Sequence, residues 1–168
     1  MAYNGISQPE RLRTGTAIRI PASSNASANI EPVLAALASR KKINDPWQAP
    51  LQGVISSHFG TRKSGFHHGV DIAAEMGSRI HTVKSGTVTF ADWKNSIYGY
   101  MVTVDHGNGF TSSYAHCSML MVKVGEKVAA GKSLALVGET GNATGPHVHL
   151  ELRKNGEIVD PMDYIPLP

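Results

Sequence analysis

The stretch that decides the fold is Gly145-Pro146-His147-Val148-His149-Leu150-Glu151-Leu152. Apolar and polar residues alternate along it after a run of turn-forming residues, a pattern typical of a β-strand. Side chains two residues apart on a strand share a face, so His147 and His149 point one way and Val148 and Leu150 point the other. Two imidazoles on one face suit a metal site, but a buried, hydrogen-bonded pair fits the pattern equally well.

The composition indicates a globular, turn-rich chain. Its 168 residues are enough for one domain with a core. Charged residues make up 17% and hydrophobic residues 41% of the chain, a composition of globular rather than intrinsically disordered proteins. The 17 glycines and 9 prolines favour a turn-rich β protein over a helical bundle. The net charge of +3 and the pI near 9.1 favour anionic surroundings such as a bacterial wall, without indicating nucleic acid. The single Cys excludes a disulfide framework and a cysteine-only zinc site.

The sequence shows neither a membrane span nor a signal peptide. It contains no run of apolar residues as long as a span requires, about 18. The first residues, Met1 to Gly5, carry neither a charged region nor an apolar one. We therefore expect either a trimmed N-terminus or export by another route.

From Trp47 onward, short alternating segments separated by glycine turns predict an all-β fold, an antiparallel sandwich or barrel. Segments 86–91 and 100–105 are expected to pair as a hairpin across Tyr98-Gly99. Further strands are predicted at 54–59, 110–116, 122–128 and 133–137. The segment Val124 to Leu136 resembles the hairpin of a biotinyl or lipoyl carrier, which implies a barrel-sandwich hybrid. Lys132 lacks the flanking Met residues of a biotin site, so we interpret the likeness as architecture rather than attachment.

The N-terminal region divides into a segment and a linker. Residues 4–21 resemble the C-terminal half of a LysM module, a small βααβ fold that binds glycan chains. Half a module cannot bury a core, so we expect a tail there rather than a glycan-binding unit. Residues 22–29 are a small polar linker, and 30–42 carry a weak helical pattern that predicts a short connector. The predicted organisation is a partial LysM-like segment at 1–21, a linker with a short helix at 22–45 and the main domain at 46–168.

The eight His residues are not equivalent. His67 and Asp71 lie four residues apart, and a neutral imidazole and a carboxylate are both zinc ligands. Together with His149 they make two His and one carboxylate, and catalytic zinc sites commonly have three protein ligands with an open position for water. Local sequence provides this inventory but does not place residues 67–71 beside residue 149.

Four motifs occur in order along the main domain. They are His67-x-Gly69-x-Asp71, Tyr114-Ala115-His116, Gly138-x-Thr140-Gly141-x-x-Thr144-Gly145-Pro146 and His147-Val148-His149. Together they resemble the lysostaphin/LytM-type zinc metalloendopeptidases of bacterial cell walls, and the resemblance covers about residues 46–165.

The resemblance implies that His67, Asp71 and His149 bind one zinc ion and that His116 and His147 are the catalytic histidines. In such a site zinc activates a water, one His accepts its proton and the other stabilises the oxyanion, although the sequence does not assign the two roles. The implied function is a zinc-dependent endopeptidase that hydrolyses peptide stems or crosslinks of bacterial peptidoglycan. We expect a monomer in the cell envelope, either in the periplasm or outside the cell, that acts on peptidoglycan peptide and binds no nucleic acid.

The remaining polar residues near these motifs receive simpler interpretations. His68 is expected to be exposed or to lie just behind the ligands, since Gly69 fixes the motif register. Glu151 shares a face with His147 and His149 and is expected to hydrogen-bond a ligand. Tyr114 is two residues from His116 and is expected on the same strand face, where both groove lining and packing fit. We expect His58, His81 and His106 at surface or turn positions. For His106 a structural role at the turn also fits.

Three other functions compete with the endopeptidase. A cysteine nucleophile is disfavoured because His116 and Cys117 are adjacent on a strand and point to opposite faces, which leaves Cys117 as a small core residue. A catalytically silent LytM-like module that binds or activates another wall hydrolase is supported by the LysM-like segment, but all five expected site residues are present. A phage-type lysin or secreted antibacterial effector shares the chemistry and fits the missing signal peptide.

Overall fold

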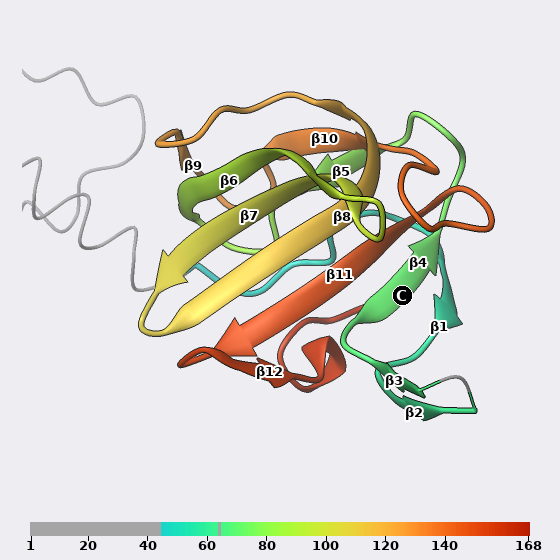
Figure 1. The fold of residues 1–168 in the computed structure, drawn as a ribbon. Helices are drawn as coiled ribbons and strands as arrows, with labels where there is room; N and C mark the ends of the chain where they lie inside the picture. The colour runs from blue at the N-terminus through green and yellow to red at the C-terminus, as the bar shows by residue number, and fades with distance from the viewer. Residues whose placement is uncertain (1–44, 64) are drawn as a thin grey trace, which may run out of the picture. The chain divides into compact units, whose positions relative to one another are not determined.

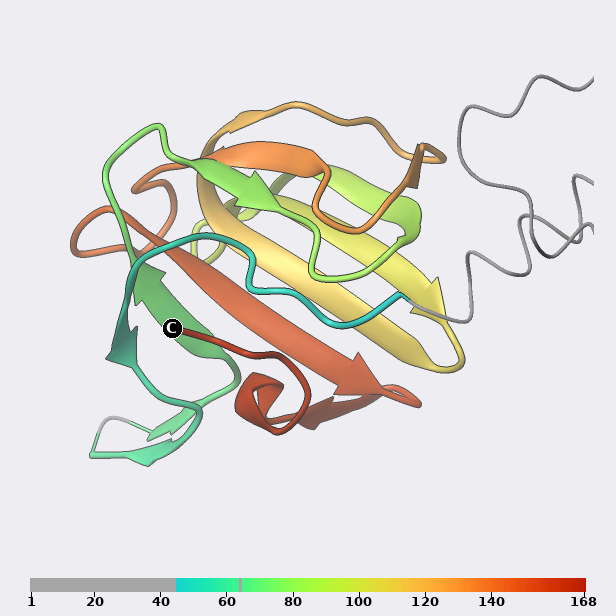
Figure 2. The same ribbon diagram turned by 180° about the vertical axis from the view of Figure 1, so that it is seen from behind.

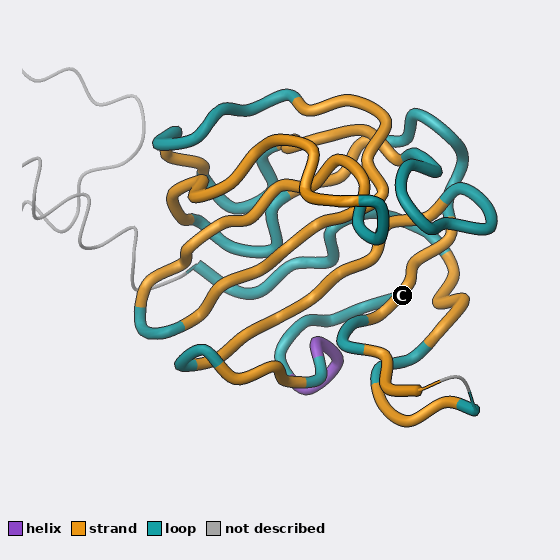
Figure 3. The backbone as a smooth tube through the Cα atoms, viewed as in Figure 1, coloured by secondary structure: helices purple, strands orange, loops and turns teal. Residues whose placement is uncertain are grey.

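The computed structural model describes residues 45–63 and 65–168, within a compact unit that spans Asp45–Pro168. Within this described part the chain is almost entirely antiparallel β, with one turn of 3-10 helix, η3 (Pro161–Asp163). The predicted all-β fold is therefore confirmed (Figure 1, Figure 3). The predicted LysM-like segment and connector helix lie outside the described residues.

Seven strands of the described residues overlap predicted segments, and five short ones, at 60–62, 65–67, 70–73, 79–81 and 157–159, were not predicted. Their bounds are β1 Val54–Ser57, β2 Gly60–Arg62, β3 Gly65–His67, β4 Val70–Ala73, β5 Arg79–His81, β6 Gly86–Asn95, β7 Gly99–Gly107, β8 Phe110–Leu120, β9 Lys127–Val128, β10 Ser133–Val137, β11 His147–Lys154 and β12 Glu157–Val159. Segment 122–128 differs, because only Lys127–Val128 pairs. The residues before this pair form a turn instead: Gly125 has φ +85°, and the Glu126 carboxylate accepts a hydrogen bond from the amide of Lys123.

The main sheet runs in the order β1-β4-β11-β8-β7-β6-β9, with β10 bridging β8 and β5 and with β12 on β11. The predicted hairpin of β6 and β7 is present, with Trp93 opposite Tyr100. Strand β11 lies between β4 and β8 near the middle of the sheet (Figure 1). Seen from behind, the segment that leads into β1 crosses the sheet (Figure 2). Trp47 in this segment packs edge-on against Phe110 of β8.

The core explains why β11 alternates. Val148 and Leu150 are fully buried in one core cluster with aliphatic side chains of other strands, which include Ile72, Val102 and Leu134. Each such side chain stabilises the fold by roughly 1.5–3 kcal/mol through the removal of apolar area from water. Because these contacts fix which face of β11 is buried, the other face, which carries His147 and His149, is held toward the pocket described next.

Candidate metal centre and active site

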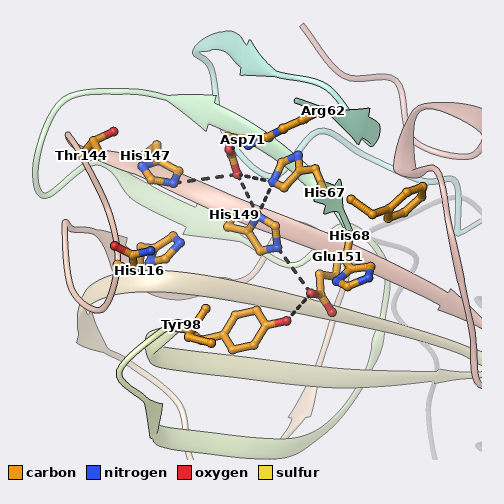
Figure 4. A pocket seen from close by; sticks show the side chains of 13 residues that line it. Arg62, His67, His68, Asp71, Tyr98, His116, Thr144, His147, His149 and Glu151 are labelled. Carbon is orange, nitrogen blue, oxygen red and sulfur yellow. Dashed lines mark hydrogen bonds and ion pairs between the residues drawn. The ribbon is translucent and has the colours of Figure 1, made fainter. Parts of the chain in front are cut away.

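Three of the predicted site residues meet where β3, β4 and β11 lie together. Asp71 and His149 are direct register partners on β4 and β11, and His67 ends β3. Asp71 Oδ1 lies 2.7 Å from His149 Nδ1 and 3.1 Å from His67 Nε2, and those two nitrogens are 3.0 Å apart (Figure 4). The three residues form a cluster in which each offers one ligand atom. Strand pairing thus provides the proximity that local sequence could not.

Hydrogen bonds at the far side of each ring orient the ligand atoms. His67 Nδ1 donates to the carbonyl of His58 at 2.8 Å. His149 Nε2 lies 3.4 Å from Glu151 Oε1, so Glu151 faces one of the candidate ligands, as expected. Each neutral ring then has its lone pair on the nitrogen that faces Asp71. Three lone-pair-bearing atoms therefore converge, an arrangement that a bound cation stabilises. Two imidazole nitrogens and one carboxylate oxygen fit zinc.

The two remaining predicted histidines flank this cluster. The rings of His116 and His147 have centroids 4.7 Å apart, and His147 Nε2 lies 3.8 Å from Asp71 Oδ1. His116 Nδ1 donates to the carbonyl of Thr140 at 2.7 Å, and His147 Nδ1 donates to that of Gly145 at 2.8 Å. In both neutral rings Nε2 is consequently the free acceptor. All five predicted residues line one open pocket of about 340 Å³.

A β-bulge in β8 brings His116 into the pocket. Tyr100 pairs with Cys117 but Val102 pairs with Tyr114, so β8 has one extra residue between them, and His116 has φ +64°. Bulges of this kind redirect a side chain and occur beside active sites. Tyr114 therefore does not share the pocket face with His116: it is fully buried, and its hydroxyl accepts from the amide of Val83 at 2.9 Å. Of the two interpretations of Tyr114, packing is correct.

Glu151 is the hub of a buried polar network beneath His149. Its side chain is 5% exposed, and Oε1 accepts a hydrogen bond from the Tyr98 hydroxyl at 2.8 Å as well as facing His149. Arg153 Nη2 lies 3.5 Å from the other carboxylate oxygen. Sequence analysis places Tyr98 in a hairpin turn but does not connect it with Glu151, because a tyrosine in such a turn carries no motif that identifies its distant partner.

The electrostatics favour the ionised form of the Asp71 carboxylate and the neutral form of the His116 ring. Burial raises the pKa of Asp71, but when His149 is protonated in the metal-free pocket its Nδ1–H donates to Asp71, and this bond together with the nearby imidazoles outweighs burial and lowers the pKa to about 2. Burial lowers the pKa of His116 more than its bond to Thr140 raises it. Burial and the adjacent Glu151 carboxylate raise the pKa of Tyr98 to about 12, so its hydroxyl remains a donor.

The rim of the pocket carries further polar groups. Arg62 Nη2 donates to Asp71 Oδ2 at 3.3 Å, which occupies the carboxylate oxygen that faces away from the histidines. His68 is exposed at the rim, as expected, with its ring against Phe66. Gly69 permits the close approach of β4 and β11, since a Cβ there would lie 2.4 Å from the carbonyl oxygen of Leu150.

The other singled-out residues lie away from the reacting centre. His106 is buried rather than at the surface, and its ring bridges the carbonyl of Ser85 at 2.9 Å and the hydroxyl of Ser112 at 2.7 Å, so its role is structural. Cys117 is fully buried, and burial raises the pKa of its thiol to about 12, which excludes a thiolate nucleophile at neutral pH.

The described part of the chain contains no helix long and apolar enough to cross a membrane.

The fold and the cluster together define a class, antiparallel β-sheet proteins in which His and Asp side chains from neighbouring strands form a candidate metal site. The chain belongs to Peptidase family M23, whose family model matches residues 65–161, more than half of its length. The resemblance to lysostaphin/LytM-type peptidases is thereby confirmed.

Curated relatives include both an activator and an enzyme. The chain is 28% identical over 158 residues to the murein hydrolase activator NlpD of Salmonella typhimurium, covering 94% of this chain and 41% of NlpD. It is 38% identical over 116 residues to the peptidoglycan DD-endopeptidase ShyA of Vibrio cholerae, covering 64% of this chain and 26% of ShyA. The chain therefore spans less than half the length of these relatives.

Among solved structures, the fold is similar to that of a zinc-containing peptidase from Vibrio cholerae. The TM-score is 0.65 and the sequence identity is 28%, over 73% of this chain and 41% of that one.

Proposed function

We propose that this chain is a zinc-dependent endopeptidase that hydrolyses peptide stems or crosslinks of bacterial peptidoglycan in the cell envelope. The observation that carries the proposal is the convergence of His67 Nε2, Asp71 Oδ1 and His149 Nδ1, flanked by two histidines with free Nε2 atoms. The similarity to ShyA, a peptidoglycan endopeptidase by name, and to a zinc-containing peptidase supports both the substrate class and the metal.

In this proposal the three converging atoms would hold one zinc ion. Zinc bound there would supply Lewis acidity and lower the pKa of water to about 7. Arg62, the His58 carbonyl and Glu151 hold the ligand side chains in place from behind. Such outer partners fix the orientation and the tautomer of the ligands.

The flanking residues His116 and His147 would transfer protons between the attacking water and the leaving amine. His116 is kept neutral by burial, so its Nε2 is suited to accept a proton from the attacking water. His147, whose Nε2 lies 3.8 Å from Asp71 Oδ1, would act in its protonated form: Nε2–H would donate to the developing oxyanion and pass its proton to the leaving amine, while His116 holds the proton taken from the water. Hydrogen bonds to the carbonyls of Thr140 and Gly145 hold both rings in position for these steps.

A second function, activation of another wall hydrolase, is favoured by one specific observation. The alignment with the activator NlpD covers 94% of this chain, whereas that with ShyA covers 64%, so the activator likeness extends into the N-terminal region. Complete ligand and catalytic sets in the M23 domain support the enzyme over this alternative.

One experiment separates the two functions. The purified chain is incubated with crosslinked sacculi, alone and together with a wall amidase, each with and without a metal chelator. The endopeptidase proposal expects the chain alone to release peptide fragments cut within the stems or crosslinks, and expects the chelator to abolish this release. Stimulation of the amidase with no intrinsic cutting would overturn it in favour of the activator.

A further inference from the structure

We infer that Tyr98 is a positioning residue that holds the ligand His149 through its side chain and the flanking His116 through its backbone. This inference rests on the proposed function, because it assigns Tyr98 a role toward the zinc ligands and the proton acceptor. Tyr98 lies in the turn between β6 and β7, and its hydroxyl points to Glu151 beneath His149 (Figure 4). Its carbonyl reaches the backbone of His116 separately.

The hydroxyl acts through Glu151. It donates to Glu151 Oε1 at 2.8 Å, and the same oxygen lies 3.4 Å from His149 Nε2. The glutamate is only 5% exposed, so water cannot readily replace a lost donor. With the hydroxyl in place, the carboxylate is fixed where it holds the His149 hydrogen on Nε2 and leaves Nδ1 facing Asp71. Without it, the carboxylate is free to turn toward Arg153, 3.5 Å from Oε2.

The carbonyl acts on the bulge in β8. It accepts a hydrogen bond from the backbone amide of His116 at 2.9 Å. His116 has φ +64°, a conformation that is unfavourable for a residue with a side chain and persists only where the surroundings hold it. The Tyr98 carbonyl is one of the contacts that hold it, together with the Thr140 carbonyl, which accepts from the ring.

The turn that carries Tyr98 is itself held firmly. Asn95 Oδ1 accepts from the amides of Ile97 and Tyr98 at 2.9 and 3.0 Å. Gly99, at φ +64°, lets the turn pack against Thr140, because a Cβ there would lie 2.3 Å from the Thr140 hydroxyl oxygen. Tyr98 therefore has a fixed position from which to act on both sides of the pocket.

Zinc affinity measured by competition with a chromophoric chelator tests the inference on the full chain. Tyr98→Phe removes the hydroxyl and retains the ring and the carbonyl. It should weaken zinc binding by about 10- to 100-fold, the usual effect of losing a partner behind a metal ligand. The matched control is Tyr114→Phe, which removes a buried hydroxyl that bonds Val83 and Ser112 instead. It should lower stability and leave zinc affinity unchanged.

A second variant excludes a merely structural effect. Glu151→Gln should also weaken zinc binding. The double variant of Tyr98→Phe with Glu151→Gln should bind zinc no more weakly than the single variant with the lower affinity, because both substitutions act through the same carboxylate oxygen. Equal zinc affinity in Tyr98→Phe and the unchanged chain, or additive losses in the double variant, would overturn the inference alone. An unchanged chain that binds no zinc would overturn the proposed function and the inference with it.

Discussion

Asp71 and His149 are direct register partners on adjacent antiparallel strands, and Asp71 Oδ1 lies 2.7 Å from His149 Nδ1. The two residues are 78 positions apart in the chain, yet the pairing of β4 with β11 makes their contact a property of the sheet. The buried side chains on the opposite face of β11 fix that register, since a slip by one residue would exchange its core and pocket faces. The candidate metal site is thus positioned by the hydrophobic core.

His149→Ala should abolish both zinc binding and endopeptidase activity. The substitution removes one of three converging ligand atoms, so the affinity should fall by more than about 100-fold, the upper end of what loss of an outer partner costs. Zinc content after dialysis and peptide release from sacculi are the readouts. His81→Ala is the matched control, because within residues 45–63 and 65–168 that ring bonds only the carbonyl of Pro50, away from the candidate metal site. Retention of one zinc per chain in His149→Ala would show that His149 is not a ligand.

His116→Asn should retain zinc and lose activity by about 10²- to 10⁴-fold, the usual contribution of a general base or acid. Asparagine is chosen because it tolerates the positive φ of this position better than alanine. Zinc content and the rate of peptide release are measured on the same sample. Loss of the metal in this variant would mean that His116 is a ligand and that the assigned ligand set is wrong.

The free energy of unfolding should fall as the pH drops below about 6.5, in part because of His106. Burial lowers the pKa of His106 in the folded chain below its unfolded value, about 6.5. Between the two pKa values the unfolded chain binds more protons, so the stability contributed by the neutral ring is present above pH 6.5 and is lost as the pH falls.

Urea unfolding at a series of pH values, with His106→Gln as the comparison, measures this contribution. The glutamine variant should be less stable at neutral pH because it loses the bridge between Ser85 and Ser112, and it should lose less of its stability on acidification. The same pH slope in both chains would contradict the assignment to His106.

Cys117 should resist thiol reagents in the folded chain. Its side chain is fully buried and burial raises the pKa of the thiol to about 12, so almost no reactive thiolate is accessible at neutral pH. Labelling should therefore proceed at the rate of unfolding and become fast in denaturant. Rapid stoichiometric labelling of the native chain would show instead that the β8 bulge opens readily.

Alternation of apolar and polar residues was enough to predict most strands, the β6–β7 hairpin and the pocket face of β11. It failed where the backbone departs from regular geometry. Nothing in the sequence marks the extra residue at His116, so Tyr114 and His116 were expected on one face although the bulge separates them. The partnership of Tyr98 with Glu151 joins residues 53 positions apart and depends on tertiary packing that local pattern does not encode.

The central proposal is tested most directly by the peptides released from crosslinked sacculi, identified by mass spectrometry. The zinc-loaded chain should release fragments cut at an internal peptide bond of the stem or crosslink, a chelator should stop the release, and added zinc should restore it. Sacculi that remain uncut by a chain carrying one zinc ion at His67, Asp71 and His149, including after removal of residues 1–45, would contradict the endopeptidase function.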